Sequence, residues 1–519
     1  MVMEATHIGL TENIVADVLF NADLLAIICR NLWDNVKTDG CPLGPNGSRV
    51  HPLLSLALTC QAVSSLALDT LWRDIQEYGF QPILRIFPSA ASGSLQVLPE
   101  EIPDETWVRF RQYASRIRYI AFDPTSCARF SSTIFLRLAE YQNPIFPKLQ
   151  CLRSDVSFVA SPSILLFLPT KTLNEIQLTF SPSTDVTTPS ACIRTIKWQV
   201  PALQTLYICC PEFDNGQYRA TSFTNLASLK GLRALTIKSH LVDYDALVQL
   251  SAFNNLEHLC VKTTSNIPSD SRQAQGGFPS LKSLHITAKV SEMPRILRLV
   301  RQGTLETLTF VDTSGEAFRT NSEFMMDFYR ELLARFPLHN LSLTYYRAAQ
   351  LDRALWASSR AVFEPLYELH RLRSIQFVGE LALDDETIKT RLAPAWPHIE
   401  LISIPQLSGN IPSCAMLSVL ARCCPRLVLL SMPFEFPSDG GALPEDVLSH
   451  RLQTLKSVNT TTKKPALIAR FLDRIFPFLV RVEGGSGWSE VDSILRHVCQ
   501  PIRWDQHQRE RGQSKEHQK

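Results

Sequence analysis

Histidines and cysteines fall at strand-like positions of the sequence, where they could act as metal ligands or nucleophiles. His258, His285 and His339 lie within or beside three different segments with strand-like alternation. Structural zinc sites usually place their ligands in close-spaced pairs, and the thirteen cysteines include no pair separated by two residues. We therefore expect neither a metal nor a cofactor, and we interpret the histidines as contact residues for a partner.

The usual signatures of catalysis are missing from the sequence. It contains no Gly-rich loop ending in Lys-Ser/Thr, no His-Glu-x-x-His and no Gly-x-Ser-x-Gly. The glycine-dense stretch 483–488 could hold an anion at a helix start, but we interpret it as a tight turn into the last helix. We expect no enzyme; a hydrolase or transferase with its site among the Cys- and His-bearing strands is the catalytic alternative.

The elements that carry these side chains follow a repeated pattern, apolar-x-x-apolar-x-apolar, whose last two positions have the period-2 spacing of a strand. Clear and weaker copies begin at Ile117, Leu149, Leu173, Leu203, Leu232, Leu256, Leu281, Leu305, Leu338, Leu372, Ile399, Leu427, Leu452 and Leu479. From Leu149 onward, successive copies start 24 to 34 residues apart. That length fits one strand, one returning helix and two turns, so the period predicts a solenoid.

Between these strands the sequence changes to helical spacing. The expected helices include Tyr244 to Phe253, Glu292 to Gln302, Asn321 to Phe336 and Cys414 to Cys424. One strand and one helix cannot bury their apolar sides alone, whereas stacked units share a continuous core. We predict an α/β fold in which residues 91–504 form a strand–helix solenoid with a concave parallel sheet. From Ile117 to Val482 this pattern resembles the leucine-rich repeat family.

The residues that face the concave side follow from alternation along each strand, because neighbours of the apolar positions point away from the core. We propose this polar, slightly basic face as the surface for an unknown protein target with some acidic character. Its candidate target-binding residues are Tyr207, Lys238, His258, Lys262, His285, Thr309, Asn340 and Gln376.

The first 90 residues do not fit the repeat and read as three short helices. Phe20 to Leu32 carries apolar residues at helical spacing, Asp39 to Val50 is a Gly- and Pro-rich loop, and the helices of Leu53 to Trp72 follow. The stretch from Leu53 to Trp72 resembles the second half of the F-box in fungal F-box proteins, and Phe20 to Leu32 resembles its first helix. This resemblance implies docking to the Skp-family adaptor of a cullin ubiquitin ligase, through Leu24, Leu25, Ile28, Leu53, Leu54, Leu56, Val63 and Trp72.

Bulk composition restricts the partners. The formal net charge is only +2 in 519 residues, so it creates no positive field that would attract nucleic acid or an anionic membrane surface. We therefore expect neither as a partner. The longest apolar runs are far shorter than a bilayer requires, and the N-terminus lacks the basic region of a secretory signal. We expect a cytoplasmic or nuclear protein with a disordered tail over residues 505–519.

Two functions remain open from the sequence. In the first, the chain is the substrate receptor of an SCF-type ubiquitin ligase: residues 1–90 dock the Skp-family adaptor and cullin complex, and the repeats hold a target. In the second, the chain is a non-catalytic scaffold for protein–protein interaction, and the N-terminal helices only cap the open end of the solenoid.

Overall fold

The part of the chain that the computed structural model describes begins with three helices. It comprises residues 21–39, 51–59, 61–76, 79–88, 90–92, 95–122, 133–155, 165, 171–181, 184, 187–210, 226, 229–263, 276–313, 322–345, 363–379, 381–407, 411–436, 448–457 and 460–501. The chain divides into two units, Met1–Lys238 and Ser239–Lys519. The tail expected to be disordered, 505–519, lies outside the described residues.

The N-terminal helices are α2 (Ala22–Asp39), α3 (Pro52–Thr59) and α4 (Gln61–Arg73). Helix α2 continues seven residues beyond the predicted end at Leu32, because the first helix-breaking residue after it is Gly40. Asp39 is thus the last residue of a helix, and the rest of the expected loop lies outside the described residues. A small shared core joins the three helices through Cys29, Leu53, Ala57 and Ala67.

The remainder of the first unit combines an irregular start with the first repeats. Its helices are α5 (Gln81–Leu84), α6 (Asp104–Ala114), α8 (Thr133–Tyr141) and α10 (Thr188–Gln199). Its strands are β1 (Ala90–Ser92) and β2 (Leu95–Val97), which pair antiparallel, then β3 (Tyr119–Phe122), β4 (Cys151–Asp155), β5 (Glu175–Thr179), β6 (Thr205–Cys209) and β7 (Ala234–Val242), which begins in this unit and ends in the second.

The second unit continues the alternation of strands and helices. Its strands are β8 (His258–Thr263), β9 (Ser283–Ala288), β10 (Thr307–Asp312), β11 (Asn340–Tyr345), β12 (Ser374–Val378), β13 (Leu401–Ser403), β14 (Leu429–Ser431), β15 (Thr454–Ser457) and β16 (Arg481–Gly484). Its α-helices are α11 (Tyr244–Leu250), α12 (Met293–Arg298), α14 (Ser322–Arg335), α16 (Asp385–Thr387), α17 (Ala393–Ala395), α18 (Met416–Cys423), α19 (Pro465–Ile475) and α20 (Trp488–Ile494). Short 3-10 helices span Val290–Glu292 and Glu364–Glu368, and π-helical turns span Ile388–Leu392 and Leu495–Cys499.

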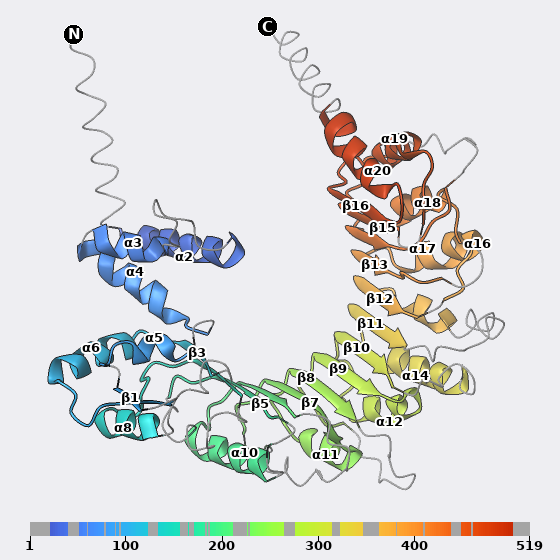
Figure 1. Ribbon diagram of the computed structural model, residues 1–519. Helices are drawn as coiled ribbons and strands as arrows, with labels where there is room; N and C mark the ends of the chain where they lie inside the picture. The colour runs from blue at the N-terminus through green and yellow to red at the C-terminus, as the bar shows by residue number, and fades with distance from the viewer. Residues whose placement is uncertain are drawn as a thin grey trace, which may run out of the picture. The chain divides into compact units, whose positions relative to one another are not determined.

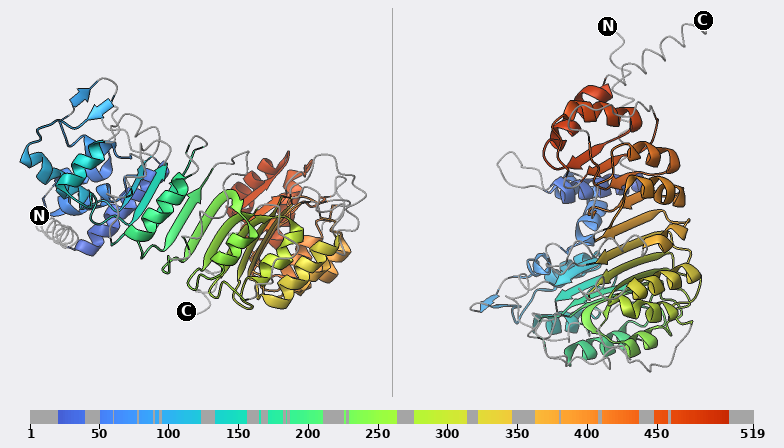
Figure 2. Two further views of the ribbon diagram at one scale, coloured as in Figure 1. Left: turned by 90° about the horizontal axis from the view of Figure 1, so that it is seen from below. Right: turned by 90° about the vertical axis from the view of Figure 1, so that its right-hand side faces the viewer.

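Strands β3 to β16 form a sheet of 14 strands in chain order, and the pairings described within each unit are parallel. Each of the fourteen copies of the apolar pattern contains or immediately precedes one of these strands. The prediction of a strand–helix repeat with a parallel sheet is therefore confirmed. The helices that alternate with the strands, such as α10 in the first unit and α12 and α14 in the second, lie on one side of the strands of their own unit (Figures 1 and 2).

The register of the sheet places apolar residues beside apolar residues of the neighbouring strands. Leu284 of β9 pairs with Leu308 of β10, which pairs with Leu341 of β11 and then Ile375 of β12, and all four are buried. Strands β9, β10 and β11 alternate buried positions with partly or fully exposed ones, since successive side chains point to opposite faces. The apolar ladder thus forms the core beneath the helices, and the polar positions line the opposite face, which we name the open sheet face.

The last repeat closes with a glycine turn and helix α20. Gly487 has a φ of 87°, and a Cβ there would lie 2.5 Å from the carbonyl oxygen of Thr462. The amide of Gly485 donates to the carbonyl of Thr460 at 3.0 Å. The segment is therefore the tight turn that we expected from its sequence, and this amide is used within the fold. In strand β16, the amide of Val482 donates to Asp492 of α20 at 3.0 Å.

Candidate functional site

The outer face of α2 and α3 carries exposed apolar side chains, and we name it the docking face. Leu24, Ile27 and Ile28 are exposed on α2, at the i, i+3 and i+4 positions that share one side of a helix. Leu54 and Leu58, one turn apart on α3, are 43% and 79% exposed. Exposed apolar side chains grouped on one side of a helix are a common mark of an interaction site.

Other residues predicted for adaptor docking lie inside the motif instead. Leu25, Leu53 and Val63 are buried, and Leu56 is only partly exposed because it packs against the shared helical core. A partner could contact these buried side chains only if the motif opened, so docking through these three positions stays a prediction. In this structure Leu53 belongs to the core that joins the three helices.

Trp72, also predicted for docking, packs toward the repeats. Its ring lies 4.5 Å from the ring of Tyr113 on α6, at an interplanar angle of 37°. Aromatic pairs at such distances stabilise a fold beyond the area that they bury. Trp72 therefore joins the motif to the first repeats, and the sequence could not separate this contact from an external one.

Backbone hydrogen bonds attach the end of α4 to the first strand of the sheet. The amide of Ile75 donates to the carbonyl of Tyr119 at 3.0 Å, and the amide of Arg118 donates to the carbonyl of Arg73 at 2.9 Å. Asp74 and Tyr119 form a parallel β-bridge. The residues after α4 thus cover part of the outer edge of β3, which is the capping arrangement considered from the sequence.

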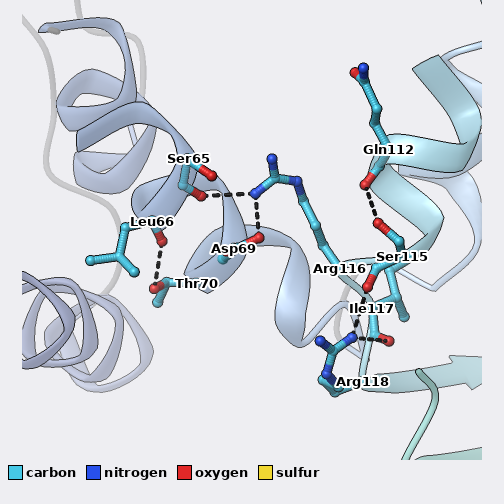
Figure 3. A network of polar contacts seen from close by, with 9 residues as sticks. All are labelled: Ser65, Leu66, Asp69, Thr70, Gln112, Ser115, Arg116, Ile117 and Arg118. Carbon is cyan, nitrogen blue, oxygen red and sulfur yellow. Dashed lines mark hydrogen bonds and ion pairs between the residues drawn. The ribbon is translucent and has the colours of Figure 1, made fainter. Parts of the chain in front are cut away.

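One arginine side chain crosses this junction, and a second is held beside it by its own sequence neighbours (Figure 3). The guanidinium of Arg116 donates to the carbonyl of Ser65 at 2.8 Å and forms an ion pair with Asp69, so it ties the chain before β3 to helix α4. Arg118 donates to the carbonyls of Ser115 and Ile117, and its partial burial lowers its pKa. The junction is therefore held by backbone, ionic and aromatic contacts together.

On the open sheet face of the second unit, the predicted target-binding residues occupy aligned positions. His285 pairs with Thr309, Thr309 with Ser342, and Ser342 with Gln376 across four successive strands. His258, Lys262 and Asn340 lie on the same face, two residues before or after this row along their strands. These residues are partly or fully exposed. The face presents a row of small and polar groups, with the histidines among the larger side chains.

The first unit contributes Tyr207 of β6 and Lys238 of β7 to its own open sheet face. The Lys238 ammonium lies 5.5 Å from the centre of the Tyr207 ring, within the range of a cation–π contact. Lys238 is exposed and Tyr207 partly exposed. This pair offers an aromatic surface beside a positive charge, a combination suited to a protein partner with acidic residues.

The buried cysteines are poorly suited to nucleophilic chemistry. Burial is the main cause that raises the pKa of Cys151, Cys192, Cys210 and Cys424 to about 12, so their thiols stay protonated near neutral pH. Among the described residues, no group of three His, Cys, Asp or Glu side chains could hold a metal ion. The same residues include no helix long and apolar enough to cross a membrane.

Comparison with known proteins assigns no family. No protein-family model matches the sequence, and no curated protein sequence matches it. Solved structures that are similar to parts of the chain include the following three. The first is an internalin from Listeria monocytogenes, at 15% identity and a TM-score of 0.34, with coverage of 64% of this chain and 80% of that one. The second is the complex of Rad7 and Elc1 in yeast, at 12% identity and a TM-score of 0.35, with coverage of 88% and 98%. The third is a TLR13–ssRNA13 complex, at 13% identity and a TM-score of 0.31, with coverage of 66% and 48%.

The structure adds two residues to the docking face that sequence reasoning missed. Ile27 and Leu58 are both more exposed than any docking residue predicted from the sequence. Their spacing from Leu24 and Leu54, three and four residues, was a usable signal, because such positions share one face of a helix. Of the eight positions implied by the resemblance, four lie inside the motif, namely Leu25, Leu53, Leu56 and Val63.

Proposed function

We propose that the chain is a non-catalytic receptor whose N-terminal helices dock a Skp-family adaptor of a cullin ubiquitin ligase and whose open sheet face holds a target protein. The observation that carries the proposal is the docking face, an apolar surface on two helices that are firmly joined to a repeat array. Such a receptor acts by proximity, because it raises the effective concentration of a target lysine near the conjugating enzyme.

The pattern of burial supports a docking role beyond capping. The capping contacts lie on α4 and the residues that follow it, through Trp72, Asp69 and the backbone of Arg73 and Ile75. Leu54 and Leu58 lie on α3 and take no part in those contacts. Capping alone needs no exposed leucine on α3, whereas a protein partner would cover these side chains and gain the free energy of their burial.

The test is a binding measurement between the purified full-length chain and the Skp-family adaptor. We expect the double variant Leu54→Asp/Leu58→Asp to weaken binding by about a hundredfold or more, because it places two charges in an apolar interface. Leu136→Asp on α8 is the matched control, since Leu136 is also exposed but lies outside the docking face. Circular dichroism confirms that both variants keep the fold.

The second candidate function is a repeat scaffold in which the motif is only a cap, and the α4–β3 junction favours it. Under this function the wild-type chain does not bind the adaptor, and Leu54→Asp/Leu58→Asp behaves like Leu136→Asp. A wild type that fails to bind the adaptor would overturn the receptor proposal and leave the open sheet face as the functional surface.

The target surface has its own test. We expect reversal of the two basic positions, Lys238→Glu and Lys262→Glu, to weaken capture of an acidic target, whereas Lys282→Glu serves as the control. Lys282 precedes β9 and forms an ion pair with Glu257 at 2.9 Å. Equal capture by all three variants would remove the open sheet face from the proposal.

A further inference from the structure

A pocket of about 740 Å³ lies within the first unit, between helices α2 and α4 and the start of β3. Pockets for small ligands commonly have volumes of roughly 300–1,000 Å³. Four arginines line it, namely Arg30, Arg73, Arg116 and Arg118. The whole chain has a formal net charge of only +2, so this concentration of guanidinium groups is a local feature.

Two aspartates also line the pocket but leave its positive charge in excess. Asp69 is paired with Arg116, and Asp74 lies at the bridge to Tyr119. Four positive charges less two negative charges leave a net charge of two in the lining. A ligand that bears a dianionic group would complement this charge.

Two of the arginines are fixed in place before any ligand arrives. In the described part of the chain, the side-chain hydrogen bonds that Figure 3 draws for Arg116 and Arg118 leave from Nη1, toward Ser65, Asp69, Ser115 and Ile117. A guanidinium carries five N–H donors. The anchored groups therefore keep donors for a ligand, and little side-chain entropy is lost when they bind it.

The other two arginines and two aromatic rings complete the lining. Arg30 on α2 and Arg73 at the end of α4 are exposed, and Arg73 lies 5.9 Å from the centre of the Tyr119 ring. Trp33 also lines the pocket. The cavity thus offers guanidinium groups for an anion and apolar ring surface for the organic part that bears it.

We propose that this pocket binds a phosphate monoester. Arginine forks match the oxygens of a phosphate in bidentate fashion, and these charge-assisted hydrogen bonds are roughly twice as strong as neutral ones. The phosphate belongs either to a phosphorylated serine of a protein or to a free phosphorylated small molecule. The site is independent of adaptor docking, because it uses the side of α2 that carries Ala26, Arg30 and Trp33 and not the docking face.

The experiment is calorimetric titration of the full-length chain with three probes: a serine-phosphorylated peptide, its unphosphorylated counterpart and free phosphoserine. We expect the wild type to bind both phosphorylated probes at least about tenfold more tightly than the unphosphorylated peptide. Phosphopeptide binding about tenfold tighter than that of phosphoserine identifies a protein source, and equal affinity identifies a small phosphorylated compound.

Variants locate the binding. We expect Arg30→Gln/Arg73→Gln to weaken phosphoserine or phosphopeptide binding by about tenfold or more. Arg85→Gln is the matched control, because Arg85 is an exposed arginine of the same unit outside the pocket. No preference for the phosphorylated probes, or equal affinities of the double variant and Arg85→Gln, would overturn the proposal.

Discussion

The repeat array and the N-terminal motif differ in how far their apolar side chains are exposed. In β11 of the array, Leu341 and Leu343 are at most 1% exposed, and the outward positions between them are polar. In the motif, Leu58 is 79% exposed. Each repeat has a neighbour that covers its apolar side, whereas the outer face of α2 and α3 has none among the described residues. The difference indicates that another protein could cover the exposed apolar side chains of α2 and α3.

The largest expected effect compares a leucine of the array with a leucine of the motif. Leu341→Ala removes a fully buried side chain and leaves a cavity, so it should lower the free energy of unfolding by about 3 kcal/mol. Leu58→Ala should change it by less than about 0.5 kcal/mol. Urea unfolding of the two variants measures the difference. A large loss of stability in Leu58→Ala would mean that this side chain is part of the core.

The junction between motif and array can be tested with two tryptophans. Trp72→Ala removes the contact with Tyr113 and should lower the free energy of unfolding by about 2 kcal/mol. Trp198→Ala is the matched control, because Trp198 on α10 is 79% exposed. A thermal melt of each variant gives the result. Equal melting temperatures for the two would show that the motif contributes nothing to the stability of the first repeats.

Substitutions in the glycine turn of the last repeat test the stability of the end of the array that lies away from the motif. Gly487→Ala should lower the free energy of unfolding by about 1 kcal/mol for its positive φ and by more for the contact with Thr462. Gly303 has a φ of 82°, and a Cβ added there would meet no atom within 4 Å, so Gly303→Ala measures the backbone cost alone. Chemical unfolding of both variants separates the two contributions. Identical losses would exclude a steric role for Thr462.

The smallest effect concerns two histidines with the same local contact. In the array, Nδ1 of His450 accepts from the amide of Leu452, and its Nε2 contacts the carbonyl of Cys424 at 2.8 Å. In the motif, Nδ1 of His51 accepts from the amide of Leu53. Burial lowers the pKa of both histidines below the ordinary value of 6.5. Folding thus favours their neutral forms, and their contribution to stability is present above pH 6.5 and lost as the pH falls below it.

Urea unfolding at about pH 7.5 and about pH 5.5 checks this dependence for the wild type, His450→Gln and His51→Gln. We expect each variant to lose less stability than the wild type between the two pH values, since one titrating group is gone. His450→Gln should also be the less stable variant at the higher pH, because it disturbs a contact to Cys424 in addition to the one with Leu452. A variant with the same pH dependence as the wild type would exclude its histidine as a contributor.

The sequence predicts the array better than it predicts the surface of the motif. The apolar pattern at Leu281, Leu305 and Leu338 anticipates β9, β10 and β11, because alternation and repeat length are local properties of the chain. The positions on the open face follow from the same alternation. In a stacked repeat, the alternation of apolar residues and the repeat length are therefore enough to predict which side chains are buried.

The motif is harder because its helices are apolar on more than one side. Leu53 and Leu54 are adjacent in the sequence, yet Leu53 is fully buried and Leu54 is 43% exposed. Trp72 looks like a docking residue in sequence but contacts Tyr113, which lies 41 positions further along. The arginine pocket likewise joins α2, α4 and β3, so only the tertiary arrangement brings its four guanidinium groups together.

The attachment of α4 to β3 also has a mechanical consequence. Helix α4 has 13 residues, which corresponds to a rigid rod about 20 Å long. Its last turn is bonded to the edge of the sheet, and its middle, through Ala67 and Leu68, packs against the helices that carry the docking face. A protein bound to that face would be held at a fixed distance from the first repeats. Changes in the length of α4 would therefore alter this distance without altering either binding surface.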